Sequence, residues 1–348
     1  MTMLLTRPMT RRAFGAGVLA TGVALAVGCT RQSAPEPAVR AEGGLRLVRV
    51  NTGLGLATGR EAYLTVAEEK GFFAEEGIRV EVIPGEGTVT NLTQLATGQV
   101  DVATIDVNAG LVEYAKGTFT DFVFTAVLHA QLLGCIIVRA DSGITRPRDL
   151  AGKRLAVIPG GTNTVLFPAF AQLNGFDPDS VELVSPPPPS FGALLAAGEV
   201  DAIQQFVLAR AAIEREVGAP IRVFTYSDTL PELYGSGLGC SRRLVAEEPD
   251  LVRAFNRAAL RGLQYAVTNP TEAGEIFARH PRHEGGQPAP VAAKENELLA
   301  PYVRADDGRA LGEFDLTRLA QSAGILRSYG LIDTSVRPEE LVAPGLFG

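Results

Sequence analysis

Two kinds of hydrophobic pattern alternate along the chain. Short apolar runs, as at residues 45–50 and 100–105, predict strands, and longer segments with apolar residues every three or four positions, as at 61–70 and 107–115, predict helices. Strands that alternate with helices are typical of parallel sheets covered by helices on both faces. The pattern therefore predicts an α/β protein.

A short sequence repeat divides the body of the chain into two halves. Residues 95–102 read Leu-Ala-Thr-Gly-Gln-Val-Asp-Val, and residues 195–202 read Leu-Ala-Ala-Gly-Glu-Val-Asp-Ala. Gly98 and Gly198 fit helix ends, where a left-handed backbone is needed. Each repeat also follows a Gly-Phe pair and a strand pattern, which indicates two similar α/β units, although unrelated α/β segments can share such fragments.

The first residues have the composition of an export signal. Arg11 and Arg12 precede an apolar stretch, residues 13–28, which carries no charge and is short for a membrane span of about 20 residues. The arginine pair resembles a twin-arginine signal, and the stretch before Cys29 resembles a lipobox. We predict a signal peptide at 1–28, acylation of Cys29 and a tether at 29–44. An ordinary cleaved signal or an uncleaved anchor helix remains an alternative.

Composition excludes several classes of protein. The formal net charge of −7 argues against nucleic acid as the main partner. With three cysteines and three histidines, the 348-residue chain fits neither a disulfide-dense scaffold nor a Cys-rich or His-rich metal site. No phosphate-binding loop or nucleophile elbow is found, and we expect no cofactor, no metal and no catalytic residue.

Several segments resemble one family of binding proteins. Residues 69–82, Glu-Lys-Gly-Phe-Phe-Ala-Glu-Glu-Gly-Ile-Arg-Val-Glu-Val, are similar to the signature near the start of periplasmic substrate-binding proteins of ABC transporters. The two Gly-x-Val-Asp repeats, residues 149–157 and residues 247–255 extend the resemblance, which covers about residues 45–330. The branch serves thiamine-pyrimidine precursors, taurine, alkanesulfonates and nitrate, and residues 225–234 look most like its thiamine-pyrimidine members.

The resemblance implies a fold and its boundaries. It implies the two-lobed periplasmic-binding-protein fold of type II, with a ligand cleft between lobes that two crossing strands join. Lobe 1 is then expected at residues 45–135 and 236–348, and lobe 2 at 136–235. The apolar strands at 133–139 and 238–240 are the expected crossing strands. They carry Cys135 and Cys240, which the family fold makes neighbours, so either a disulfide or two buried thiols is possible.

The same resemblance implies a function. The protein is expected to be a monomeric, exported, lipid-anchored receptor at the outer face of the cytoplasmic membrane, which hands a small molecule to an ABC permease and its ATPase. The expected ligand is a thiamine-pyrimidine-like heteroaromatic, or a sulfonate or related small anion. The alternatives are a secreted enzyme on the same fold and a sensory binding module that partners a membrane kinase.

Candidate ligand contacts lie in loops that follow strands, because ligands of open α/β sheets sit beyond the carboxyl ends of the strands. Asp106 is either a ligand group or the cap of helix 107–115, and Thr88 and Thr162 have the same two interpretations. Residues 160–162, two glycines and a threonine ahead of a helix, suit an anion. His129 is either structural or a ligand contact. Ser190 lies in one of these loops and can also cap the helix that follows it. The predicted ligand-binding residues are Asn51, Thr88, Asp106, Asn108, Gly161, Thr162, Asn163, Gln205, Tyr226 and Tyr234.

Overall fold

A computed structural model describes residues 44–53, 55–56, 58–304, 308–334 and 336–347. The predicted signal peptide, Cys29 and almost all of the predicted tether lie outside the described residues. Among the helices of the described ranges, none combines the length and the apolar character needed to cross a membrane.

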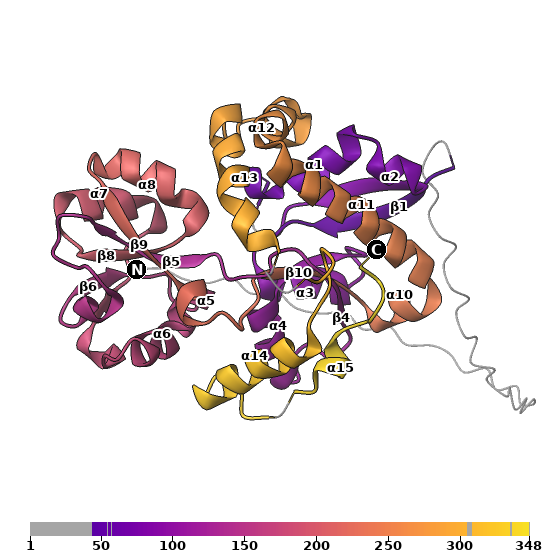
Figure 1. Cartoon of the computed structure of the whole chain (residues 1–348). Helices are drawn as coiled ribbons and strands as arrows, with labels where there is room; N and C mark the ends of the chain where they lie inside the picture. The colour runs from indigo at the N-terminus through magenta and orange to yellow at the C-terminus, as the bar shows by residue number, and fades with distance from the viewer. Residues whose placement is uncertain (1–43, 54, 57, 305–307, 335, 348) are drawn as a thin grey trace, which may run out of the picture. The chain divides into compact units, whose positions relative to one another are not determined.

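Lobe 1 contains two small sheets (Figure 1). Strands β1 (Arg46–Asn51) and β2 (Ile78–Ile83) pair in parallel, and Val50 forms a single bridge to Val102. Strand β10 (Ser236–Cys240) lies between β3 (Ala103–Asp106) and β4 (Val123–Val127), antiparallel to both. The carboxyl ends of β1 and β3 therefore lie side by side, although the sheet that contains β3 is antiparallel and not parallel as the α/β pattern predicted.

Lobe 2 is built on a five-stranded mixed sheet with the order β7-β6-β8-β5-β9. Its members are β5 (Gly134–Arg139), β6 (Arg154–Ala156), β7 (Glu182–Val184), β8 (Ala202–Phe206) and β9 (Ile221–Thr225). Strands β6, β7 and β8 are parallel, while β5 runs antiparallel to β8 and β9. The predicted lobe boundaries stay predictions.

Helices cover these sheets. Those of lobe 1 before the crossing are α1 (Ala62–Glu69), α2 (Phe72–Glu75), α3 (Thr88–Ala96) and α4 (Val107–Ala115). Lobe 2 has α5 (Thr162–Val165), α6 (Phe167–Leu173), α7 (Phe191–Ala197), α8 (Arg210–Val217) and α9 (Tyr226–Thr229). The C-terminal part has α10 (Arg242–Glu247), α11 (Pro249–Thr268), α12 (Pro270–Arg279), α13 (Ala289–Val303), α14 (Leu316–Ser328) and α15 (Pro338–Leu341). Short 3₁₀ helices lie at Gly59–Glu61, Pro147–Leu150, Pro178–Ser180, Pro188–Ser190, Val207–Ala209 and Pro281–His283.

The sequence repeat has a structural counterpart in each lobe. Asp101 accepts hydrogen bonds from the backbone N–H and the guanidinium of Arg49 on β1, at 2.8 and 3.3 Å. In lobe 2, Asp201 accepts from the backbone N–H and the guanidinium of Arg154 on β6, again at 2.8 and 3.3 Å. The repeated aspartate therefore holds the end of a helix-to-strand turn against a strand of its own lobe, β1 in lobe 1 and β6 in lobe 2. The glycines Gly98 and Gly198 have φ angles of 71° and 70°, as predicted.

Two chain segments pass between the lobes, and they differ from the predicted crossing strands. Strand β5 lies inside the lobe 2 sheet and β10 inside a lobe 1 sheet, so Cys135 and Cys240 are not on neighbouring strands. Both cysteines are buried free thiols, which excludes the disulfide alternative in this structure. The connections are residues 128–133 and 230–235, and they pair through the Gly235 N–H, which donates to the His129 carbonyl at 3.0 Å.

Candidate functional site

The candidate site is a cavity of about 160 Å³ where both lobes and both connections meet. Arg60, Thr88 and Asp106 line it from lobe 1, and Thr162, Asn163 and Phe206 line it from lobe 2. His129 contributes from the first connection. The remaining lining residues are Gly53, Gly87, Thr104, Leu132, Leu133, Gly134, Gly235 and Ser236.

A buried asparagine positions the lobe 1 side of this cavity. Asn91 on α3 is inaccessible to solvent, and its Nδ2 donates to the carbonyls of Thr52 and Thr104 at 2.9 and 2.7 Å. Its Oδ1 accepts from the Glu86 N–H at 3.2 Å. One side chain thus holds together the loops that follow β1 and β2 and the end of β3.

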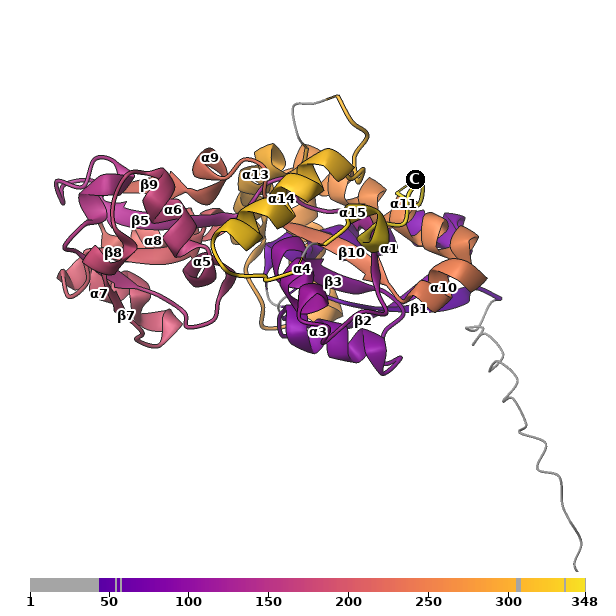
Figure 2. The same cartoon turned by 90° about the horizontal axis from the view of Figure 1, so that it is seen from below.

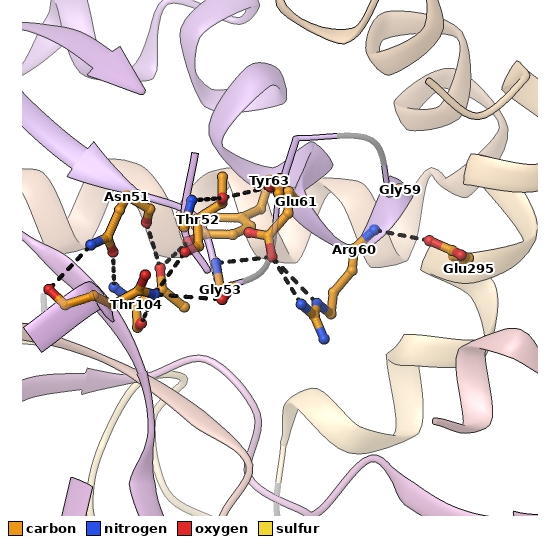
Figure 3. A network of polar contacts seen from close by, with 12 residues as sticks. Asn51, Thr52, Gly53, Gly59, Arg60, Glu61, Tyr63, Thr104 and Glu295 are labelled. Atoms are coloured by element: carbon orange, nitrogen blue, oxygen red, sulfur yellow. Dashed lines mark hydrogen bonds and ion pairs between the residues drawn. The ribbon is translucent and has the colours of Figure 1, made fainter. Parts of the chain in front are cut away.

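Arg60 lies in the 3₁₀ helix that precedes α1, and protein groups hold its backbone and its side chain (Figure 3). Its N–H donates to the Glu295 carboxylate at 3.2 Å, and its guanidinium bonds to Glu61 Oε1 at 3.3 Å. The Glu61 side chain is only 2% exposed. The charge of Arg60 is therefore compensated inside the protein, where ion pairs are screened less than at the surface. Across the cavity, the Phe206 ring centroid lies 5.8 Å from the guanidinium carbon.

Asp106 follows β3 and caps α4. Its Oδ1 accepts from the Ala109 N–H at 2.9 Å, which confirms the predicted cap. The same residue lines the cavity, so the two interpretations are compatible. Burial raises the pKa of Asp106 to about 6, even though the Ala109 N–H stabilises the charged form.

His129 lies against the cavity without a protein partner for its imidazole Nδ1 among the described residues. The residue is 4% exposed. Burial, and to a smaller extent the charge of Arg60, lowers the pKa of His129 to about 3. The imidazole of this cavity-lining residue is therefore neutral, and its Nδ1 can accept or donate one hydrogen bond. The sequence favoured a structural role for this residue and left a ligand contact as the alternative.

The helix-cap interpretation is wrong for three residues: Thr88 and Thr162, which line the cavity, and Ser190, which does not. Gly87, not Thr88, precedes α3, and the Thr88 hydroxyl accepts from the Asp106 N–H at 3.1 Å. Thr162 begins α5 but makes no side-chain cap bond. Ser190 makes none either, because its hydroxyl donates to the Pro187 carbonyl at 2.8 Å. Helix α5 is also only four residues long, so residues 160–162 do not have the strong helix dipole that an anion site would use.

Four of the ten predicted ligand contacts line the cavity, and the others lie elsewhere. Asn51, Asn108, Tyr226 and Tyr234 are buried, while Gly161 and Gln205 are half-buried outside the lining. The Tyr226 hydroxyl donates to the Asn163 carbonyl at 2.8 Å, and Asn163 Nδ2 donates to the Gln205 carbonyl at 3.1 Å. These groups therefore hold the 160–163 loop on the lobe 2 sheet. The four that line the cavity are Thr88, Asp106, Thr162 and Asn163.

Arg60 is not among the ligand contacts predicted from the sequence. The one signal for Arg60 in the sequence is its position: it is a single basic residue at the start of the first helix, directly after a Gly-rich loop. Many surface arginines share that context, so the signal is weak without the ion pair to Glu61.

Comparisons with known proteins agree with this architecture. The family model described as "NMT1/THI5 like" matches residues 60–273. A protein of Haemophilus influenzae named "Putative thiamine biosynthesis protein" is 26% identical over 287 residues, which cover 80% of this chain and 86% of that protein. The "Formylaminopyrimidine-binding protein" of Halalkalibacterium halodurans is 25% identical over 217 residues, which cover 62% of this chain and 65% of that protein.

A solved structure shares the fold. The crystal structure of the periplasmic aliphatic sulphonate binding protein SsuA from Escherichia coli superimposes with a TM-score of 0.68 at 15% identity, over 85% of this chain and 92% of that one. The two-lobed fold expected from the sequence is therefore confirmed.

Proposed function

Because the chain belongs to the family described as NMT1/THI5 like, we propose that it is an exported solute-binding lipoprotein that delivers a small heteroaromatic molecule to an ABC permease. The observation that carries this proposal is the cavity between the lobes. A half-buried carboxyl and a histidine line it, and the Nδ1 of that histidine has no protein partner in the part of the chain that the structure describes. Ligand bound there contacts both lobes at once and so favours their closed arrangement over the open one.

The charges around the cavity favour a neutral or weakly basic ligand over a small anion. Arg60 is the cation that lines the cavity, and Glu61 already compensates it. The Asp106 carboxyl adds negative charge, and His129 is neutral. For a sulfonate or nitrate, the cavity lining offers no positive charge that is not already paired. Burial of such an unpaired anion is costly.

An aminopyrimidine matches these groups in chemical type. Its exocyclic amino group donates to the Asp106 carboxyl, and a ring nitrogen or a hydroxyl substituent meets the His129 imidazole. The exposed Phe206 ring offers a flat apolar face for the heterocycle. Thr88 and Thr162 supply hydroxyls from opposite lobes. None of these contacts involves covalent chemistry.

Titration calorimetry tests the ligand class. The mature protein is titrated with 4-amino-5-hydroxymethyl-2-methylpyrimidine and, separately, with ethanesulfonate and with taurine. We expect saturable, stoichiometric binding of the pyrimidine and recovery of the unchanged molecule after release. Binding of the sulfonates without the pyrimidine would contradict the proposed ligand class, and conversion of the pyrimidine to a product would favour an enzyme.

Membrane anchoring is a separate prediction, which rests on Cys29. Cys29→Ser removes the thiol that would be acylated, so we expect the protein to move from the membrane fraction to the soluble exported fraction. Cell fractionation with immunodetection measures this, and Thr30→Ala, next to the modified position, serves as the control that stays in the membrane. Retention of Cys29→Ser in the membrane, with the signal segment still cleaved at the same place, would exclude the lipid anchor.

A further inference from the structure

Arg318 binds both of the connections between the lobes. It lies in the first turn of α14, a helix beside α4 of lobe 1 in both views (Figure 1 and Figure 2). Its Nη2 donates to the Ala130 carbonyl of the first connection. In the second connection, Nη2 donates to the Pro231 carbonyl at 2.7 Å, and Nε donates to the Glu232 carbonyl at 3.0 Å. One planar guanidinium therefore joins the two connections to each other and to α14.

Other groups of α14 hold the second connection as well. The ring of Tyr234 lies against the guanidinium, with 4.2 Å between its centroid and the guanidinium carbon. The hydroxyl of Tyr234 accepts from the Asp315 N–H at 3.0 Å. The Ser322 hydroxyl donates to the Glu232 carbonyl at 2.8 Å. Because α14 also contacts α4, these bonds fix the second connection to lobe 1.

In the first connection, the backbone hydrogen bonds change from one lobe to the other at Leu132. The Gln131 N–H donates to the Tyr302 carbonyl in α13 at 3.3 Å. Two residues further on, the Leu133 carbonyl accepts from the Val207 N–H of lobe 2 at 2.8 Å. No backbone hydrogen bond of Leu132 is found in the described ranges. This residue can therefore change its dihedral angles without breaking a backbone bond to either lobe.

In the second connection, the change from one lobe to the other falls at Leu230. Its N–H donates to the Tyr226 carbonyl in α9 of lobe 2, at 2.8 Å. Its carbonyl accepts from the Leu233 N–H at 3.1 Å, within the segment that α14 holds. The dihedral angles of this one residue therefore separate a bond to lobe 2 from the part fixed to lobe 1. Hinges of closing domains are formed by a few such residues.

We infer that the lobes pivot at Leu132 and Leu230, and that Arg318 confines the pivot to these two residues. It does so by keeping residues 128–131 and 231–235 on lobe 1. Arg318 does not line the ligand cavity, so it acts as a positioning residue. The inference rests on the proposed function, because the pivot serves closure around a ligand.

Loss of the guanidinium has a consequence for the ligand. Without it, more residues of both connections can rotate, and the ligand-free protein populates more lobe orientations. The ligand then selects the closed arrangement from a smaller fraction of molecules, and the apparent affinity falls by that fraction. Arg318→Ala should therefore weaken binding although the side chain lines no part of the cavity.

The distance between the lobes tests the pivot without any ligand. Nitroxide labels are attached to Ala74→Cys on α2 and Leu173→Cys on α6, two exposed positions, in the full chain that carries Cys29→Ser. The other two cysteines are buried free thiols, so the labels do not reach them in the folded protein. Pulsed electron paramagnetic resonance gives the distribution of distances. We expect Arg318→Ala to widen this distribution at least about twofold.

Arg253→Ala is the matched control. Arg253 on α11 also donates to a backbone carbonyl, that of Gly345 at 3.3 Å, but this carbonyl lies in neither connection. The control should keep the width of the unchanged protein. An unchanged width in Arg318→Ala, or an equal increase in both variants, would overturn the inference. If a thermal melt shows that Arg318→Ala does not fold, Arg318→Lys replaces it. Lysine keeps the charge but lacks the planar fork, so widening is still expected.

Calorimetry with 4-amino-5-hydroxymethyl-2-methylpyrimidine is the second arm. We expect Arg318→Ala to bind this probe about threefold to tenfold more weakly than the unchanged protein, and Arg253→Ala to bind it equally well. Equal affinity of Arg318→Ala and the unchanged protein would overturn the inference. If the probe does not bind the unchanged protein, the proposed ligand class fails, and the label distances still decide where the lobes pivot.

Discussion

Asp106→Asn is expected to weaken aminopyrimidine binding by about tenfold to a hundredfold. A hydrogen bond to a charged group contributes about 1.5–3 kcal/mol, and about 1.4 kcal/mol corresponds to a factor of ten. Asparagine is a good helix cap, so the bond from the Ala109 N–H is kept and α4 still begins at Val107. Calorimetry at pH 7 with the wild-type protein and the variant measures the loss.

The same variant is expected to be more stable than the wild type at neutral pH when no ligand is bound. The folded protein raises the pKa of Asp106 from 3.8 to about 6 through burial. The contribution of this carboxyl to stability is therefore complete below about pH 4 and is lost as the pH rises through about 6. Thermal melts should show an advantage for Asp106→Asn at pH 7.5 that shrinks towards pH 4.

The combination of the two results separates a ligand group from a cap. If Asp106 were only a cap, replacing it with asparagine would leave the affinity for the aminopyrimidine unchanged. An unchanged dissociation constant in the variant would therefore remove Asp106 from the site. A variant that melts well below the wild type at pH 7.5 would show instead that the charged carboxyl stabilises α4.

Local chemistry explains which parts of the fold were predictable. The cap at Asp106 and the left-handed turns at Gly98 and Gly198 depend on residues within a few positions of each other, and these predictions are confirmed. The Gly-x-Val-Asp repeat was also visible, although its reason, the bond from each aspartate to an arginine of a distant strand, required the structure.

The errors arose where partners are distant in sequence. Tyr226 fits a stacking role by its type, but its hydroxyl is used by the Asn163 carbonyl and its ring packs 4.7 Å from that of Phe170. One error was local instead. Pro168 interrupts the helix predicted to run from residue 162 to Leu173, because proline has no N–H to continue the ladder, and this leaves α5 short.

His129 shows a different limit. A lone histidine in an apolar segment is usually satisfied by the protein, and only the structure shows that its Nδ1 has no partner among the described residues. Its neutrality likewise follows from burial, which the sequence does not report. Candidate ligand groups of this kind are recognised by a buried polar atom that lacks a hydrogen-bond partner. A sequence pattern does not show which polar atoms lack partners.

Gly262→Ala is expected to lower the free energy of unfolding by about 1–3 kcal/mol, the usual cost of extra volume in a packed core. Gly262 lies in α11 where this helix crosses α1. A Cβ atom there would lie 2.3 Å from the Tyr63 carbonyl oxygen and 2.7 Å from the Ala67 Cβ. Because these are backbone and Cβ atoms, the two helices must move apart. Tyr63 packs beneath the site, with its hydroxyl 3.4 Å from that of Thr104, so ligand affinity should fall as well.

Gly324→Ala is the matched control for this prediction. Gly324 also lies within a helix, α14. Apart from its chain neighbours and the backbone of its own helix, no heavy atom of the described residues would come within 4 Å of a Cβ atom there. Alanine loses less backbone entropy than glycine on folding, so this variant should gain about 0.5–1 kcal/mol. Urea denaturation of both variants measures the two effects side by side. If Gly262→Ala were as stable as Gly324→Ala or more stable, α11 and α1 would not approach as closely as described. The conclusion that this helix contact holds Tyr63 in place beneath the site would then be wrong.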